Sequence, residues 1–231
     1  MQVAILAGGR GVRLNPLTQT VPKPMVPIKG RPFLDYQIEL LRDQGFRRFL
    51  LLVGYLAEAI VSHFGDGREW GVSIEYSREQ TPLGTGGALK LAEPLLEDKW
   101  LLLNGDTYLP IDYGAMTRRS ADLSCTILMA VYGNLERVAP NNVLLSEDLV
   151  SRYDKRNPTE MSHVDAGAYV FNKNALDRIP SGVDVSIETD LLPDLARSKK
   201  MGAYPVDQRF YDIGTFERLA IAGKVLGHDP R

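Results

Sequence analysis

Residues 3–25 constrain the fold of this chain more than any other segment. An apolar run at residues 3–6 stops at a glycine pair, which predicts a buried strand that delivers a loop to the carboxyl edge of a sheet. Gly8, Gly9 and Gly11 lack a Cβ, so their backbone can adopt positive φ and lie close to a ligand. Successive N–H groups in such a loop converge on an anion, and the segment therefore predicts an anion-binding loop.

Three basic side chains, Arg10, Arg13 and Lys23, accompany these glycines. A glycine turn with three cations is typical of a polyphosphate site. The P-loop pattern is absent, and the dinucleotide-binding loop has a third glycine where this chain has Leu14. Three prolines in the same segment prevent a regular helix. The alternative interpretation is a surface turn rich in glycine and basic residues.

The order G-G-x-G-x-R-L-x-P-L-T…P-K-P-M resembles the signature of the sugar-1-phosphate nucleotidyltransferases, and the resemblance extends from Met1 to about Leu226. It implies an α/β fold with a three-layer, Rossmann-like, mixed and mainly parallel sheet. It also implies that the glycine loop binds nucleotide phosphates and that Arg13 and Lys23 are the catalytic residues that neutralise them. Val12 stands where the family usually has Thr or Ser, which removes one hydroxyl contact to a phosphate.

The pattern of elements differs between the two halves of the chain. Strands alternate with helices in the first half, which predicts a parallel sheet, whereas strands follow one another in the second half, which predicts mixed pairing. We therefore expect one domain over residues 1–231, with a nucleotide-binding half at about 1–110 and a sugar-binding half at about 111–231. The predicted helices cover residues 32–45 and 55–64, and the predicted strands cover 3–6, 49–53, 72–76, 100–103, 123–132, 143–146, 149–153 and 166–171.

Residues 79–89 contain a proline and three glycines, which predict a rigid corner before a helix that begins at Ala88. A simple strand–helix turn is the alternative. In the family that this chain resembles, this corner recognises the base. The sequence L-G-T-G-G-A-L is similar to that of the guanylyltransferases for mannose 1-phosphate and heptose 1-phosphate. The resemblance implies a nucleotide-binding set of Leu6, Ala7, Gly8, Gly9, Gly11, Arg13, Glu79, Gly84, Thr85 and Asp106.

Two acidic motifs predict a magnesium site. Asp106 follows a predicted central strand directly, where side chains face the ligand crevice of such sheets, although an isolated aspartate in a turn can also be a cap. By resemblance, Asp106 is the family's metal-binding aspartate. Asp212 lies in Y-D-I-G-T, which resembles the family's W-x-D-I-G-T and implies the second ligand of Mg²⁺. One or two carboxylates suit this ion, which keeps waters and substrate phosphates as its other ligands.

The second half resembles the family's sugar-phosphate site. Lys155 follows Tyr-Asp where the family has an aromatic–acidic pair, and its alternative is membership of a solvated charge run. Glu188 lies in the first turn of a predicted helix capped by Ser186, which favours the helix dipole, and it also matches a glutamate that holds sugar hydroxyls. Both roles stay open. The implied sugar-phosphate set is Asn104, Lys155, Gly167 and Glu188.

Composition excludes several other classes. A net charge of −2 argues against a nucleic-acid partner, and no apolar run approaches the length of a membrane span. The first strand begins directly after Met1-Gln2, so we expect no leader, and one cysteine suits a reducing cytoplasm. Cys125 lies in a strand-like run and is expected to be buried and inert. The three histidines show no ligand spacing, which argues against zinc.

The resemblance to the sugar-1-phosphate nucleotidyltransferases implies a magnesium-dependent enzyme, monomeric or homodimeric, with a nucleoside triphosphate and a sugar 1-phosphate as its substrates. The predicted reaction transfers a nucleotidyl group from GTP to D-glycero-alpha-D-manno-heptose 1-phosphate or mannose 1-phosphate and releases pyrophosphate. Three alternatives stay open. They are uridylyl or thymidylyl transfer to N-acetylmuramate or glucose 1-phosphate, a non-catalytic regulatory protein that binds nucleotide sugars, and a scaffold protein.

Overall fold

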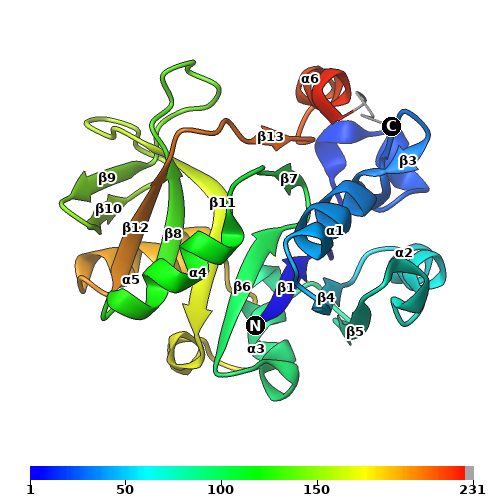
Figure 1. Cartoon of the computed structure of the whole chain (residues 1–231), viewed down its shortest axis with the longest axis horizontal. Helices are drawn as coiled ribbons and strands as arrows, with labels where there is room; N and C mark the ends of the chain where they lie inside the picture. Colours follow the sequence, from blue (N-terminus) through cyan, green and yellow to red (C-terminus); the bar gives the residue numbers. More distant parts are fainter. Residues whose placement is uncertain (227–231) are drawn as a thin grey trace.

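The computed structural model describes residues 1–226. In this range a nine-stranded sheet, in the order β5-β4-β1-β6-β11-β8-β12-β10-β9, extends through both halves of the chain (Figure 1). Two small sheets each pair two strands, β2 with β3 and β7 with β13. The strands of the large sheet are β1 (Gln2–Leu6), β4 (Arg48–Val53), β5 (Ser73–Arg78), β6 (Lys99–Asn104), β8 (Ile127–Tyr132), β9 (Val143–Ser146), β10 (Leu149–Tyr153), β11 (Val164–Asn172) and β12 (Met201–Val206). The short strands are β2 (Pro27–Ile28), β3 (Arg31–Pro32), β7 (Thr107–Tyr108) and β13 (Tyr211–Asp212).

The first half forms the parallel part of the sheet, as predicted. β5, β4, β1 and β6 are all parallel, and a helix separates each consecutive pair of these strands in the sequence. The three helices are α1 (Phe33–Asp43), α2 (Ala57–Phe64) and α3 (Gly84–Ala92). Residues 49–53 of β4 are fully apolar and buried, because helices cover both faces of the sheet.

The second half introduces mixed pairing, which confirms the predicted fold class. β11 is antiparallel to both β6 and β8, whereas β12 is parallel to β8. Helices α1, α2 and α4 (Tyr113–Asp122) contribute to a core cluster on one face of the sheet. Helices α3 and α5 (Leu192–Arg197) contribute to a second cluster on the other face, so the fold has three layers.

Several elements differ from the sequence expectations. β8 begins at Ile127, and Cys125 precedes it in a buried position where burial raises the pKa of the thiol. Strand β12 was not predicted, because Gly202 and Pro205 interrupt the strand pattern. Pro205 is tolerated because β10 pairs with β12 only at Gly202, so the missing N–H at Pro205 has no partner to lose.

The end of the described chain returns to the first half. After β12 the chain crosses the molecule, forms β13 and enters α6 (Phe216–Leu226) beside the N-terminal loops (Figure 1). Ile213, Ala222 and Leu226 pack with Leu14 and with neighbouring side chains of the first 33 residues. Segments from the two sides of residue 110 therefore pack against each other. None of the helices within residues 1–226 has the length and apolarity needed to cross a membrane.

Candidate active site

A cavity of about 950 Å³ lies at the carboxyl ends of β1 and β6, and residues from both halves of the chain line it. Nearly all of the residues that the sequence predicted to bind substrates or metal line this cavity. Ala7 is the exception among them, because its side chain is buried and its N–H donates to the Leu52 carbonyl. The predicted residues on the cavity wall are Leu6, Gly8, Gly9, Gly11, Arg13, Lys23, Glu79, Gly84, Thr85, Asn104, Asp106, Lys155, Gly167, Glu188 and Asp212.

The glycine loop packs tightly against its neighbours. Gly11 has φ of 62°, and a Cβ at this position would lie 2.9 Å from the Cβ of Lys23. A Cβ on Gly8 would lie 2.9 Å from Oε1 of Glu79. The prolines have the predicted effect, since the loop forms three short 3-10 turns, at 12–14, 17–19 and 23–25, and no regular helix.

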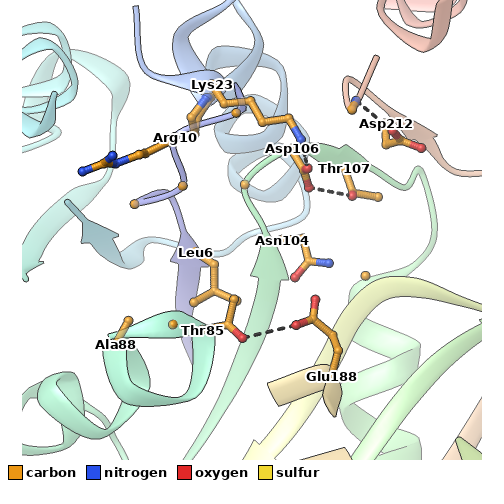
Figure 2. Close-up of a pocket in the computed structure, with 18 of the residues that line it drawn as sticks. Leu6, Arg10, Lys23, Thr85, Ala88, Asn104, Asp106, Thr107, Glu188 and Asp212 are labelled. Carbon is orange, nitrogen blue, oxygen red and sulfur yellow. Dashed lines mark hydrogen bonds and ion pairs between the residues drawn. The ribbon is translucent and has the colours of Figure 1, made fainter. Parts of the chain in front are cut away.

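Lys23 and Asp106, which both line the cavity, form an ion pair (Figure 2). Lys23 is nearly buried, and its ammonium contacts Oδ2 of Asp106. Oδ1 of Asp106 accepts a hydrogen bond from the Thr107 hydroxyl at 3.1 Å. Burial opposes ionisation of this carboxyl, but the Lys23 charge and the two hydrogen bonds outweigh it and hold the pKa of Asp106 below its usual value. Asp106 is therefore a carboxylate at neutral pH.

The pairing of β7 with β13 brings Asp212 beside Asp106. Asp212 is opposite Thr107 in this pairing, and the Ile213 N–H donates to the Asp106 carbonyl at 3.0 Å. Oδ2 of Asp212 accepts a hydrogen bond from Nη1 of Arg218 at 3.0 Å. Arg218 lies in the first turns of α6 and also lines the cavity. Sequence patterns did not identify Arg218, because its role depends on where α6 returns.

A buried glutamine of α1 holds the turn that carries Asp106. Gln37 is 1% exposed, and its Nε2 donates to the carbonyls of Asn104 at 2.9 Å and Thr107 at 2.7 Å. These two residues flank Gly105-Asp106, so one side chain fixes both ends of the turn. The only sequence signal for Gln37 was a polar residue on the apolar face of a predicted helix.

We expect Gln37→Met to lower both kcat and stability, because the variant keeps the side-chain length but leaves two carbonyls unpaired. The free energy of unfolding should fall by about 2 kcal/mol, and kcat by about tenfold. Urea unfolding and initial-rate kinetics measure the two effects. Gln44→Met is the matched control, since Gln44 likewise bonds a loop at Ile111 and Tyr113. An equal loss of kcat in both variants would contradict a specific role of Gln37.

Lys155 and Glu188 form an ion pair on the part of the cavity wall that comes from the second half of the chain. Nζ of Lys155 donates to Oε1 of Glu188 at 3.2 Å, and the hydroxyls of Ser186 and Thr85 donate to Oε2 at 3.0 and 3.3 Å. Burial opposes ionisation of Glu188, but the Lys155 ammonium and the hydrogen bond from Ser186 hold its pKa below the ordinary value. Ser186 also accepts from the Thr189 N–H at 3.3 Å, as predicted for the cap. Glu188 therefore lies in a first turn and on the cavity wall at once.

Gly167 and Asp165 form the adjoining wall on β11. Gly167 has φ of 74°, and a Cβ there would lie 3.0 Å from Nδ2 of Asn104. Oδ2 of Asp165 accepts hydrogen bonds from the hydroxyls of Tyr153 at 2.9 Å and Tyr169 at 2.7 Å. Burial nevertheless raises the pKa of Asp165 above its usual value. These contacts fix the Asp165 carboxyl on the cavity wall, where Lys155 and Glu188 also lie.

The glycine corner begins helix α3 at Gly84, four residues earlier than predicted. Oε2 of Glu79 accepts from the Leu83 N–H at 3.0 Å, and burial raises the pKa of this carboxyl. Thr85, a residue of the predicted nucleotide-binding set, lines the cavity, and its hydroxyl contacts Glu188 and the Ile187 N–H in the other half. Leu6 and Ala88 lie beside Thr85 on the cavity wall (Figure 2).

Comparison with known proteins assigns this architecture to a family. The model of the nucleotidyl transferase family matches residues 2–226. The chain belongs to the nucleotidyl transferase family. This nucleotidyltransferase is 33% identical over 229 residues to the D-glycero-alpha-D-manno-heptose 1-phosphate guanylyltransferase of Aneurinibacillus thermoaerophilus, with 99% of each chain covered. The resemblance predicted from the sequence is thereby confirmed.

Other relatives of this nucleotidyltransferase carry other names. A UTP–glucose-1-phosphate uridylyltransferase of Synechocystis sp. is 32% identical over 93% of this chain and 60% of its own length. The crystal structure of HddC from Yersinia pseudotuberculosis complexed with GMP-PN has a TM-score of 0.82 and 29% identity, with 97% of this chain and 99% of that chain covered. The chain is thus a sugar-1-phosphate nucleotidyltransferase, as predicted, while guanylyl and uridylyl relatives have nearly equal identity. The roles of individual residues stay predictions.

Proposed function

We propose that this enzyme acts in the cytoplasm and transfers the guanylyl group of GTP to a manno-configured sugar 1-phosphate. Among the acceptors we place D-glycero-alpha-D-manno-heptose 1-phosphate ahead of mannose 1-phosphate. The observation that carries the base assignment is the corner at residues 82–87, whose sequence resembles that of guanylyltransferases and whose Pro82, Gly84 and Thr85 line the cavity. The full-length similarity to a heptose 1-phosphate guanylyltransferase and the structural likeness to a protein complexed with GMP-PN support it.

The two ends of the cavity suit the two substrates. The glycine loop, Arg13 and Lys23 supply N–H groups and positive charge for the triphosphate. Lys155 supplies an ammonium for the phosphate of the sugar, and Glu188 supplies a carboxylate for its hydroxyls. Between these ends lies Asp106, at the carboxyl end of β6. A phosphate carried by Lys155 and a triphosphate on the glycine loop would therefore meet near Asp106.

The proposed reaction needs no covalent intermediate on the protein. A phosphate oxygen of the sugar 1-phosphate attacks the α-phosphorus of GTP, and a new P–O bond forms. The bond from the α-phosphorus to the bridging oxygen breaks, and pyrophosphate leaves with those electrons. The protein contributes positioning and charge neutralisation, in which Lys155 orients the attacking phosphate and Arg13 and Lys23 offset the charge on the triphosphate.

Enzymes of this family generally use a divalent metal ion, and we propose Mg²⁺. The donor chemistry fits, since Asp106 and Asp212 present hard carboxylate oxygens on paired strands. Within residues 1–226, no three or more histidine, cysteine, aspartate or glutamate side chains gather as a metal site, so phosphates and waters would complete the shell. When bound, the ion supplies Lewis-acid stabilisation of phosphoryl charge. Thr107, Lys23 and Arg218 hold the two carboxylates in place.

Guanine can be distinguished by the backbone of the glycine corner. Its Watson–Crick edge offers a carbonyl acceptor together with N1–H and amino donors. Backbone N–H and C=O groups can pair with these, and a pyrimidine would leave such groups unpaired, which discriminates strongly. The free acceptor capacity of Glu79 on the cavity wall suits the amino group of guanine. A uridylyltransferase or a thymidylyltransferase is the second candidate for the base, because the Synechocystis relative carries the uridylyl name.

A grid of four nucleoside triphosphates against a panel of sugar 1-phosphates tests the proposal. We expect kcat/KM for GTP to exceed that for UTP and dTTP by at least about tenfold with the heptose and mannose acceptors. Pyrophosphate release in the presence of magnesium is the measurement. Preference for UTP or dTTP with every acceptor would overturn the guanylyl assignment. Nucleotide-sugar binding without turnover would favour the regulatory alternative.

A further inference from the structure

The glycine-rich corner is joined to the sugar-binding half along a backbone seam. The Val185 N–H donates to the Leu83 carbonyl at 2.9 Å, and the Gly86 N–H donates to the Val185 carbonyl at 2.7 Å. The glycines permit this contact, because a Cβ on Gly87 would lie 2.6 Å from the Val183 carbonyl oxygen. These glycines therefore have a structural reason that is separate from any contact with a base: they let the start of α3 lie against residues 183–185.

Thr85 lies at the centre of this seam, and its hydroxyl is directed away from the nucleotide half. Oγ1 accepts a hydrogen bond from the Ile187 N–H at 2.8 Å. The same hydroxyl donates to Oε2 of Glu188 at 3.3 Å (Figure 2). A hydroxyl has one proton to donate, and Thr85 uses that proton on Glu188. Both hydrogen bonds of the Thr85 hydroxyl are therefore made with the segment that carries Glu188.

Glu188 is held from three directions. Lys155 contacts Oε1, while Ser186 and Thr85 share Oε2. Lys155 and Ser186 belong to the same half of the chain as Glu188, but Thr85 comes from α3 in the other half. Loss of the Thr85 hydroxyl would leave Oε2 of Glu188 with only the Ser186 hydroxyl of these two donors, and it would remove the acceptor of the Ile187 N–H. Both changes would allow the Glu188 side chain to adopt other orientations.

We propose that Thr85 is a positioning residue for the sugar subsite, which it serves by orienting Glu188 through its hydroxyl. This inference rests on the proposed role of Glu188 in binding sugar hydroxyls. Its consequence is that one segment serves both substrates: Pro82 and Gly84 line the cavity in the corner proposed to recognise the base, and the Thr85 side chain shapes the sugar side. Acceptor selectivity is then determined partly in the half of the chain that binds the nucleotide.

Thr85→Val and Thr85→Ser separate the hydroxyl from the shape of the side chain. We expect Thr85→Val to raise the KM for the sugar 1-phosphate by about tenfold, because a hydrogen bond to a charged group is lost. The KM for GTP should stay within about twofold, since a hydrogen bond to the base is not involved. Thr85→Ser keeps the hydroxyl and should restore the wild-type KM for the sugar. Thr117→Val removes a hydroxyl that bonds only within α4 and is the matched control.

A double-mutant cycle with Glu188→Gln tests whether Thr85 acts through Glu188. We expect Thr85→Val to raise the KM for the sugar far less in the Glu188→Gln background than in the wild type, because the residue through which it acts is already altered. Thermal unfolding of each variant shows whether the fold is kept. Equal effects in both backgrounds would overturn the inference. A raised KM for GTP with an unchanged KM for the sugar would also overturn it and would place Thr85 at the nucleotide.

The wild-type assay separates this inference from the proposed function. If the wild-type enzyme transfers no guanylyl group to any acceptor in the panel, the proposed function fails. If the wild type is active and Thr85→Val leaves the KM for its best acceptor unchanged while the variant is folded, only the positioning role of Thr85 fails.

Discussion

Replacing Asp106 with alanine is expected to lower kcat by about 10³-fold, because it removes one of the two carboxylates proposed to hold the metal ion, whose charge stabilisation is worth several kcal/mol. The geometry supports a large effect. Asp106 follows β6 by two residues, lines the cavity and lies beside Asp212. Initial rates of pyrophosphate release at saturating substrates and magnesium provide the measurement.

Stability must be controlled in this experiment, because Lys23 loses its partner in the Asp106→Ala variant while it is nearly buried. Asp106→Asn keeps the size of the side chain and an oxygen for Lys23, and it should also be inactive. Asp122→Ala removes a surface carboxylate that lies 4.0 Å from Arg119 and should behave as the wild type. A folded Asp106→Asn variant with a near-normal rate at saturating magnesium would refute the metal-ligand role.

Replacing Lys155 with alanine is expected to lower kcat/KM for the sugar 1-phosphate by about 10²-fold, because a charge-assisted contact that orients the attacking phosphate is lost. The Lys155 side chain is 42% exposed and its ammonium lies 3.2 Å from Oε1 of Glu188, so it can reach a phosphate that enters the cavity. The KM for GTP should change little. Kinetics with each substrate varied in turn distinguish the two constants.

The neighbouring Arg156 gives a matched control for this experiment. Arg156 is exposed and belongs to the same charged run, but it does not line the cavity within the described part of the chain. Arg156→Ala should therefore leave the kinetics unchanged. If Arg156→Ala and Lys155→Ala had equal effects, a general charge effect of the run would replace the specific role of Lys155. Impaired GTP binding with normal use of the sugar would reassign Lys155 to the nucleotide.

The sequence by itself determined the features that depend on local chemistry. The continuous apolar run of 49–53 and the glycines after 3–6 predicted β4, β1 and the loop, because a strand buried on both faces is apolar throughout and because glycine lacks a Cβ. The prolines correctly excluded a helix from the loop, and Ser186 was correctly placed as a cap. Each of these outcomes involves residues within a few positions of one another, so the order of the chain is sufficient information.

Only the tertiary structure decided which distant groups meet. The pairing of β7 with β13 places Asp212 beside Asp106, which a family motif can imply but no local pattern can derive. The place of Arg218 on the cavity wall depends on the return of α6, and the contact of Thr85 with Glu188 depends on the seam at residues 183–185. The physical reason is that these contacts join residues up to about a hundred positions apart. Their partners are set by the packing of the sheet and its helices, and local propensity does not encode that packing.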